Sequence, residues 1–291
     1  MILDKMSNLQ QRVIMGSLSI ICLFVAISLS YNAYFAPIFA LLAAGVISLA
    51  LGEFYHIARA KGLYPQIKLG ILSTIIYGFS IFLATQSSTA QLLPFIILAL
   101  TLVALFLYYC VKGTNPLINL SIALFGLAYL TIPLSFLIAI NYFISDPFVL
   151  DGRWCLLYLL LVTKITDIGA YFIGKKFGNK KLAPKISPEK TWEGAIGGLC
   201  SAILTSVLMY FIFHLFFERP PFNLTFWQSL WLATLISITG QFGDLTESLL
   251  KRDTGVKDSS NWLPGMGGFL DLVDSLIFTA PLMYLFLRMN A

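Results

Sequence analysis

The stretch GQFGDLTESLLKRDTGVKDSSNWLPGMGGFLDLVDSLIF, residues 240–278, joins two apolar runs through a polar segment that contains five glycine and proline residues between 255 and 268. Apolar runs of about 20 residues recur along the whole chain, which is the length that a helix needs to cross the hydrocarbon of a bilayer. Of the 291 residues, 58% are hydrophobic and 11% are charged, whereas a soluble domain carries about 25% charged residues. The sequence therefore predicts an all-α polytopic membrane protein and excludes a water-soluble domain.

The apolar runs predict nine membrane-spanning helices, with the N-terminus in the cytoplasm and the C-terminus outside. The orientation follows from the cationic residues, because the cytoplasmic loops of membrane proteins are enriched in Lys and Arg. With the N-terminus inside, 15 of the 19 cationic residues fall in cytoplasmic segments, three fall outside and Lys164 lies within a span. The predicted spans lie near residues 12–30, 33–52, 67–85, 92–111, 118–142, 154–174, 194–217, 227–250 and 268–288.

The two halves of the chain differ in chemistry. Residues 1–150 hold five predicted spans with almost no ionisable group at membrane depth, so we expect a transmembrane scaffold that contacts lipid and provides a dimer surface. His56, beside Glu53 at the end of a predicted span, is interpreted as an interfacial residue. Residues 151–291 hold four predicted spans and every candidate catalytic group, so we expect a catalytic domain with a polar cavity on the cytoplasmic side.

Four carboxylates occur at the cytoplasmic ends of the last two predicted spans. Asp244 and Glu247 lie three residues apart, and Asp271 and Asp274 have the same spacing, which puts each pair on one face of a helix. Carboxylates placed so close together repel each other unless a cation compensates them, and Mg²⁺ prefers oxygen ligands. The four acids therefore predict a magnesium site, with a second cation left open.

Lys164 and Asp167 form a further charged pair, three residues apart in the sixth predicted span. Their opposite charges allow a simple mutual ion pair, which is one interpretation. In the other, Asp167 lines the same polar cavity as the acids of the later spans, because charged groups inside a membrane protein usually face its interior or a water-filled cavity.

A basic loop, GKKFGNKKLAPKISPEKTWEG at residues 174–194, precedes the seventh predicted span. Its lysines suit anionic lipid headgroups, but its end also offers Ser187, Lys190 and Thr191 at the start of a helix, where free N–H groups favour phosphate. The glycines of residues 256–268 allow backbone N–H groups to approach phosphate closely. Both segments are expected on the same side of the membrane as the acids.

Together these elements predict a site for phosphoryl or nucleotidyl transfer, in which carboxylates hold Mg²⁺ and lysines neutralise developing charge. The sequence contains no GxxxxGK[ST] motif of P-loop proteins and no HExxH or Ser-His-Asp arrangement. A cation-coupled transporter is the main alternative, since intramembrane acids and glycine breaks also mark ion pathways. The clustering of charges on the cytoplasmic side, away from the midplane, argues against it.

At these residues the chain resembles the phosphatidate cytidylyltransferase (CDP-diacylglycerol synthase) family. The family signature contains a Ser, a Lys-Arg pair, Lys-Asp, Pro-Gly-His-Gly-Gly and Asp-Arg-x-Asp, and residues 248–274 here read SLLKRDTGVKDSSNWLPGMGGFLDLVD. TDIGAYFIGKKFG at 166–178 and SPEKTWEG at 187–194 also resemble family segments. The likeness covers most of residues 160–285, whereas the first 150 residues match only as apolar spans.

The resemblance implies a Mg²⁺-dependent enzyme that transfers CMP from CTP to phosphatidate, giving CDP-diacylglycerol and pyrophosphate. We expect a homodimer in the bacterial inner membrane, surrounded by lipid, with its active site facing the cytoplasm and no nucleic-acid partner. Carried over from the family, the catalytic residues would be Asp244, Lys251, Asp271 and Asp274, the metal ligands Asp244, Asp271 and Asp274, and the substrate-binding residues Asp167, Ser187, Lys190, Thr191, Arg252, Lys257, Asp258, Gly267 and Gly268.

Two positions depart from the family signature. Met266 stands where the family has His, which removes a group able to handle a proton or bind phosphate. Leu272 stands where the family has Arg, which leaves Asp271 and Asp274 more dependent on metal for charge balance. The favoured interpretation is an active enzyme that tolerates both changes. A catalytically silent membrane scaffold and an enzyme acting on another lipid phosphate, such as an isoprenoid phosphate, stay open as alternatives.

Overall fold

The computed structural model describes residues 8–144, 150–218, 220–256, 259–260 and 267–290, without the side chains of residues 8–15. Helices dominate these residues, because in hydrocarbon a helix satisfies all its backbone hydrogen bonds within one segment. The predicted all-α polytopic class is thereby confirmed. In the described part of the chain, the segments long and apolar enough to cross a membrane are Ala36–Ala60, Ile67–Gln86, Ser88–Lys112, Pro116–Asn141, Gly152–Phe177, Trp192–Phe216 and Phe269–Met289.

Those seven segments overlap seven of the nine predicted spans, although Ala36–Ala60 extends eight residues beyond the predicted end at 52 and so includes Glu53. The other two predicted spans fall on helix α1 (Asn8–Leu29) and helix α9 (Phe226–Asp253). The apolar part of α1 whose side chains the structure describes is Gly16–Leu29, and this stretch is shorter than a membrane span. The apolar residues of α9 are interrupted by Gln228 and Gln241, which lower its mean hydropathy. The count of nine spans therefore stays a prediction.

Contacts within the chain divide it into two compact units, each of which is described here by itself. Unit 1 comprises Met1–Ala139 and Asp253–Val273, and unit 2 comprises Ile140–Arg252 and Asp274–Ala291. Helix α10 (Phe269–Val273), in the family-like signature, therefore packs with the N-terminal helices, although it belongs to the second half of the chain in sequence.

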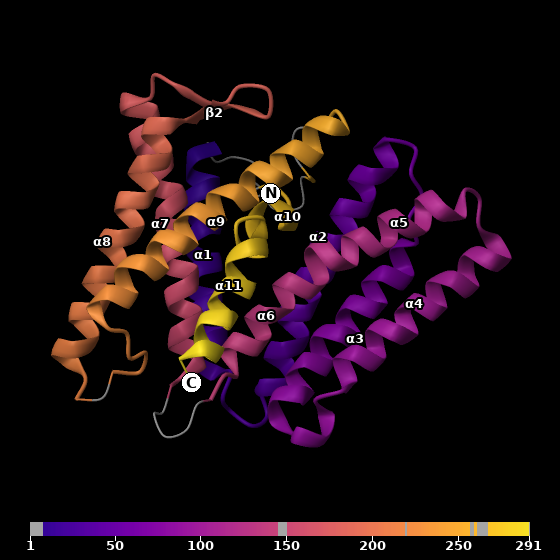
Figure 1. The fold of residues 1–291 in the computed structure, drawn as a ribbon, viewed down its shortest axis with the longest axis horizontal. Helices are drawn as coiled ribbons and strands as arrows, with labels where there is room; N and C mark the ends of the chain where they lie inside the picture. The colour runs from indigo at the N-terminus through magenta and orange to yellow at the C-terminus, as the bar shows by residue number, and fades with distance from the viewer. Residues whose placement is uncertain (1–7, 145–149, 219, 257–258, 261–266, 291) are drawn as a thin grey trace. The chain divides into compact units, whose positions relative to one another are not determined.

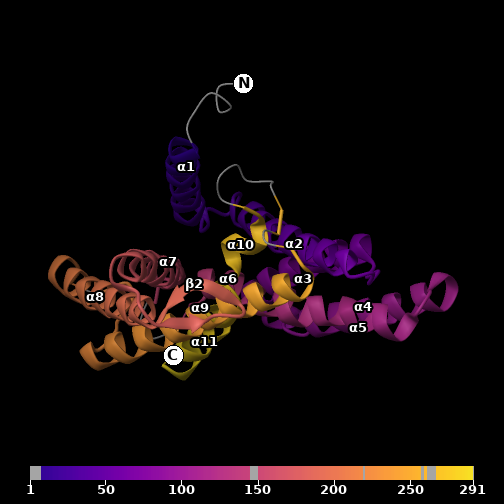
Figure 2. The same ribbon diagram turned by 90° about the horizontal axis from the view of Figure 1, so that it is seen from above.

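Helices α3, α4 and α5 of unit 1 lie beside one another in the view from above (Figure 2). Tyr55 in α2 ties this unit together: its hydroxyl donates to the Ala123 carbonyl oxygen at 2.7 Å, and a Cβ on Gly70 or Gly126 would lie 2.5 Å from its ring. The elements of unit 1 are α1, α2 (Ala36–Ala60), α3 (Ile67–Gln86), the 3-10 turn η2 (Ser88–Ala90), α4 (Leu93–Lys112), α5 (Pro116–Gly126), the π-helical turn η3 (Leu127–Thr131), the start of α6 (Ile132–Asn141) and α10 (Phe269–Val273).

Helices α7 and α8 of unit 2 run side by side (Figure 1). Small residues allow this close approach, because a Cβ on Gly194 would lie 2.8 Å from the Ala170 carbonyl oxygen and one on Gly198 would lie 2.8 Å from that of Thr166. The elements of unit 2 are α7 (Gly152–Phe177), β1 (Lys181–Ala183), β2 (Ser187–Thr191), α8 (Trp192–Phe216), most of α9 and α11 (Leu276–Met289).

The basic loop before α8 contains a short antiparallel hairpin, β1–β2, which the sequence analysis did not predict. The hairpin is attached at both ends. At its base, the Glu193 carboxylate accepts hydrogen bonds from the backbone N–H groups of Asn179 at 3.1 Å and Lys180 at 3.2 Å. Near its turn, the Ile186 carbonyl oxygen accepts a hydrogen bond from Arg252 Nε at 3.2 Å. The lysines of the hairpin are thereby held in a defined place.

The last predicted span, near 268–288, is interrupted at Asp274 and Ser275, where α10 ends and α11 begins. The Asp274 carboxylate accepts a hydrogen bond from the Ser275 N–H at 2.5 Å. Such a local bond between a side chain and the backbone competes with the helical pattern. The expectation that Asp271 and Asp274 share one face of a continuous helix is therefore wrong.

Candidate active site

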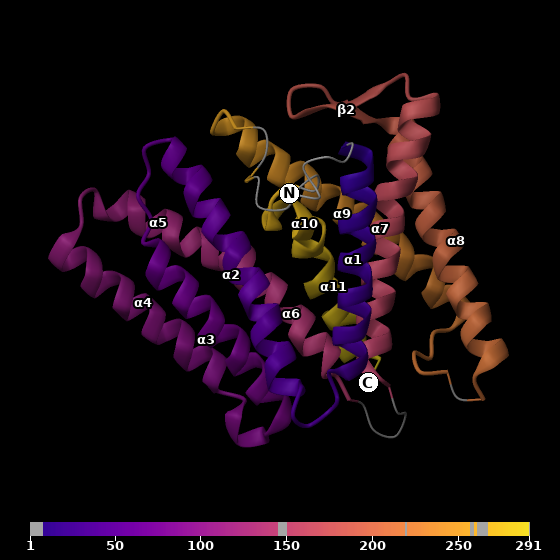
Figure 3. The ribbon, with the colours of Figure 1, turned by 180° about the vertical axis from the view of Figure 1, so that it is seen from behind.

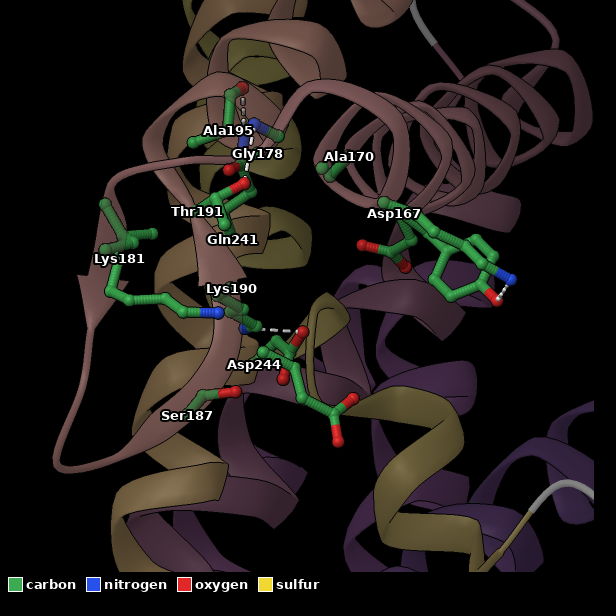
Figure 4. A pocket seen from close by; sticks show the side chains of 16 residues that line it. Asp167, Ala170, Gly178, Lys181, Ser187, Lys190, Thr191, Ala195, Gln241 and Asp244 are labelled. Carbon is green, nitrogen blue, oxygen red and sulfur yellow. Dashed lines mark hydrogen bonds and ion pairs between the residues drawn. The ribbon is translucent and has the colours of Figure 1, made fainter.

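A pocket of about 660 Å³ lies in unit 2, bounded by α7, the hairpin, α8 and α9 (Figure 4). Five of the residues predicted from the sequence line it, although they come from three separate elements. Lys175 and Lys181 add two further cations to its wall. The predicted residues that line the pocket are Asp167, Ser187, Lys190, Thr191 and Asp244.

An ion pair between Lys190 and Asp244 joins the hairpin to α9 inside this pocket. The Lys190 Nζ atom lies 2.6 Å from Asp244 Oδ2, and the two side chains are 25% and 35% exposed. The Lys181 side chain extends toward the same region of the pocket (Figure 4). Both lysines therefore reach the space that a negatively charged ligand in this pocket would occupy.

Asp244 also belongs to a cluster of three carboxylates with Glu247 and Asp274. One ligand oxygen from each residue lies within 4.8 Å of the others. Because Mg²⁺ binds oxygen at about 2.0–2.1 Å, ligands on opposite sides of the ion lie about 4 Å apart. The limit of 4.8 Å is slightly longer than that, so small side-chain rotations would bring the three carboxylates onto one magnesium ion.

Two lysines compensate part of the negative charge of this cluster. Lys190 pairs with Asp244, and Lys251 pairs with the almost fully buried Glu247 at 3.0 Å. Lys164 lies 3.7 Å from Asp167, as one interpretation of the sequence expected. Carboxylates are hard oxygen donors of the kind that Mg²⁺ prefers, so the residues fit the predicted ion.

A buried polar atom next to the cluster points the same way. Ser275 is fully buried directly after Asp274, and its Oγ atom has no hydrogen-bond partner among the residues that the structure describes. Buried polar atoms normally have a partner, and an exception is commonly explained by water or an ion. The free hydroxyl is therefore consistent with a bound ion or its water in this region.

Asp271, predicted as a catalytic residue and metal ligand, belongs to unit 1. Its carboxylate accepts hydrogen bonds from the Gly268 N–H at 2.7 Å and from Ser259 Oγ at 2.9 Å. Gly267, just before, has a φ of +86°, a conformation that favours glycine. The two predicted glycines thus shape the backbone around Asp271, whose assignment as a metal ligand stays a prediction.

Several other predicted residues have structural partners. Thr191 begins α8 as its N-cap, and its hydroxyl accepts a hydrogen bond from the Gly194 N–H at 3.1 Å. Arg252 donates to the hairpin as described above, so its predicted contact with the triphosphate stays a prediction. Lys257, Asp258 and Met266 lie outside the described residues.

Two residues at or near functional groups, Gln241 and Glu53, were not predicted as site residues, and Glu247 was predicted only as one of the four acids of the magnesium site. Glu247 completes the carboxylate cluster. Gln241 lines the pocket one helical turn before Asp244, and its side-chain amide donates to the Ala195 carbonyl oxygen at 3.3 Å. Its spacing of three residues from Asp244 could have identified it. Glu53 is buried, and the signal for it was a single acid at the end of an apolar span.

The fold and the site together define a polytopic membrane protein with a polar site suited to polyphosphate chemistry. The chain belongs to the cytidylyltransferase family, whose sequence model matches residues 10–290. This finding confirms the family predicted from the signature.

Named relatives agree with this assignment. The phosphatidate cytidylyltransferase of Chlamydia trachomatis serovar D is 33% identical over 291 residues, covering 96% of this chain and 92% of that protein. The phosphatidate cytidylyltransferase of Chlamydia pneumoniae is 33% identical over 297 residues with the same two coverages. That of Staphylococcus haemolyticus is 48% identical over 138 residues, which are 47% of this chain and 50% of that protein.

Proposed function

We propose that this protein is a phosphatidate cytidylyltransferase. A phosphate oxygen of phosphatidate attacks the α-phosphorus of CTP, the bond from that phosphorus to the β-phosphate oxygen breaks, and CDP-diacylglycerol and pyrophosphate are formed. Family membership and the names of the relatives support this reaction. The observation that carries it is the Lys190–Asp244 contact, because it places a lysine-lined pocket directly beside a carboxylate cluster.

Each part of the site has a role in this proposal. Lys190 and Lys181 neutralise the phosphates of CTP, since fixed cations stabilise the charge that develops in the transfer. Asp244, Glu247 and Asp274 would hold Mg²⁺, and the resemblance adds Asp271. When bound, the ion would screen the negative charge of the triphosphate and orient it. The apolar spans keep the site at the bilayer, where phosphatidate resides.

The setting of the enzyme forms part of the same proposal. We place it as a homodimer in the bacterial inner membrane, with nine spans and its site facing the cytoplasm, where CTP is made. The distribution of cationic residues supports this orientation, because Lys and Arg mark cytoplasmic loops. Residues 175–193 and 251–267 carry nine of those cations on the side assigned to the cytoplasm.

The test is a transfer assay with the purified protein in lipid nanodiscs. We expect a labelled liponucleotide from labelled CTP, phosphatidate and Mg²⁺, and none when EDTA removes the metal. Asp274→Asn and Asp271→Asn should each abolish product while the protein elutes and melts like the wild type. Normal turnover in both variants would remove the carboxylate mechanism.

The same preparation separates the alternatives. Polyprenyl phosphate offered in place of phosphatidate tests whether the protein acts on an isoprenoid phosphate. In that case, product would form only with polyprenyl phosphate. Cation flux into liposomes without consumption of CTP would favour the transporter instead. Neither product nor flux from a well-folded protein would favour the silent scaffold.

A further inference from the structure

Glu53 in α2 makes four hydrogen bonds to residues of the signature stretch, all within unit 1. Its Oε1 atom accepts from Ser260 Oγ at 2.6 Å and from the Phe269 N–H at 3.0 Å. Its Oε2 atom accepts from Ser259 Oγ at 3.0 Å and from the Leu270 N–H at 2.8 Å. One side chain thereby joins two described pieces of the signature, 259–260 and 267–273, to a helix of the N-terminal half, with α10 lying against α2 (Figure 3).

The burial of Glu53 shows that these bonds matter. The residue is 7% exposed and lies within a segment apolar enough to span the membrane, where an acid is costly unless it is paired or hydrogen-bonded. Among the described residues, its hydrogen-bond donors are the uncharged groups given above. Hydrogen bonds to an ionised carboxylate are stronger than neutral ones. A scaffold helix that only contacts lipid has no need for such a group.

The bonds continue from Glu53 to Asp271. Ser259 Oγ lies within hydrogen-bond distance of both carboxylates, at 3.0 Å from Glu53 and 2.9 Å from Asp271. A serine hydroxyl has one proton to donate, so the two acids share it. The orientation of Ser259, and through it that of Asp271, therefore depends on Glu53.

Gly268 is fitted to the same carboxylate. A Cβ at this position would overlap the Glu53 carboxylate and the Ser259 hydroxyl, so any other residue would displace them. Its N–H group donates to Asp271 at 2.7 Å. The last glycine of the family-like signature is thus required by a residue that lies more than 200 positions earlier in the chain.

We propose that Glu53 is a positioning residue of the transfer site, which holds Ser259, Ser260 and the start of α10 so that Asp271 keeps its working orientation. This inference rests on the proposed function and on Asp271 taking part in it. The N-terminal half then contributes a group on which catalysis depends, in addition to its role as a scaffold.

The test compares Glu53→Gln with Thr74→Val. The amide nitrogen of Gln cannot accept a hydrogen bond, so at least one backbone donor at the start of α10 loses its partner. Thr74→Val removes a buried hydrogen bond of 2.7 Å to Thr131 elsewhere in unit 1 and serves as the matched control. We expect Glu53→Gln to lower kcat about 100-fold, as misplacement by about 1 Å can do, to raise the Mg²⁺ concentration needed for half-maximal rate, and to leave the KM for CTP within a few-fold.

A second readout does not depend on activity. Hydrogen–deuterium exchange should be faster at the amides of 267–273 in Glu53→Gln and unchanged there in Thr74→Val. Ser260→Ala removes one of the four hydrogen bonds to Glu53 and should shift exchange and kcat in the same direction by less, which keeps the test usable if Glu53→Gln does not fold. Wild-type exchange at these amides, or kinetic changes no larger than those of the control, would overturn the inference. A wild-type protein that makes no liponucleotide would instead refute the proposed function.

Discussion

At the scale of single residues, the Lys190–Asp244 ion pair is the contact on which the chemistry of the pocket depends. Both side chains are partly exposed, so a phosphate entering the pocket can compete with Asp244 for the ammonium group. A divalent ion held by the carboxylates would then balance the negative charge of Asp244 in place of Lys190. Lys190 is therefore placed to exchange one anionic partner for another when substrate binds.

The first prediction is that Lys190→Gln lowers kcat/KM for CTP about 100-fold, a loss of about 2.7 kcal/mol of transition-state stabilisation. Glutamine retains a hydrogen-bond donor but loses the positive charge that a triphosphate needs. Steady-state kinetics with varied CTP would measure the change. Lys185→Gln is the matched control, because it removes the same charge from an exposed position of the same hairpin outside the pocket. Equal losses in both variants would show that only the general charge of the hairpin matters.

Residues also set the limit of what the sequence predicts about the site. Asp167, Lys190 and Asp244 were all identified from charged positions in or beside apolar runs, and the structure brings them to one pocket. Glu53 was not, because its four partners lie 206 to 217 residues away in sequence. Local spacing carries no information about such distant contacts. From the sequence Glu53 was placed at the end of the predicted span 33–52, and only the structure shows it inside a membrane-length helix, where a lone acid needs partners.

At the scale of elements, the packing of α7 against α8 fixes the shape of the pocket. A Cβ on Gly198 would meet the Thr166 carbonyl oxygen at 2.8 Å, and that backbone oxygen cannot move without shifting α7. The hairpin leads directly into α8, and Thr191 caps it. A change in the separation of the two helices would therefore move Lys190 as well.

The second prediction concerns Gly198→Ala, which should lower the stability of the protein by about 1–3 kcal/mol through overpacking and reduce transfer activity. Gly45→Ala in α2 is the control, because a Cβ at Gly45 has no atom within 4 Å. That substitution should be neutral or stabilise by about 0.5–1 kcal/mol, as alanine is favoured over glycine in helices. Thermal unfolding in detergent, followed by size-exclusion chromatography, would measure both. A Gly198→Ala protein as stable as wild type would mean that α7 and α8 tolerate a wider spacing.

The elements show where hydropathy suffices and where it fails. Seven spans were placed correctly because length and apolar composition are read directly from the sequence. The β1–β2 hairpin was missed, since its few residues carry lysines and prolines rather than an alternating pattern, and Glu193 and Arg252 hold it from outside. The break between α10 and α11 was missed because it depends on how the Asp274 side chain bonds the next N–H group.

At the scale of the whole molecule, the structure of unit 2 bears on the number of spans. The chain leaves the hairpin through α8 and returns to it at the end of α9, where Arg252 Nε donates to the Ile186 carbonyl oxygen. Since α8 is long and apolar enough to cross the membrane, a return to the same side requires a second crossing. Helix α9, with 28 residues and a rise of about 1.5 Å per residue, is long enough to make it despite its two glutamines.

The third prediction is therefore that α9 spans the membrane and that the hairpin and the segment after α9 lie on the cytoplasmic side. The side of each loop would be measured with fusions to two reporters. Green fluorescent protein fluoresces only in the cytoplasm, and alkaline phosphatase is active only outside it. We expect alkaline phosphatase activity for fusions within 220–225 and after Arg288, and fluorescence for fusions at 254–256 and in the turn after α2. Fluorescence at 220–225 would mean that α8 does not cross, and phosphatase activity at 254–256 would mean that α9 does not. A crossing by only one of the two helices would separate the hairpin from Arg252 and would require a different active site.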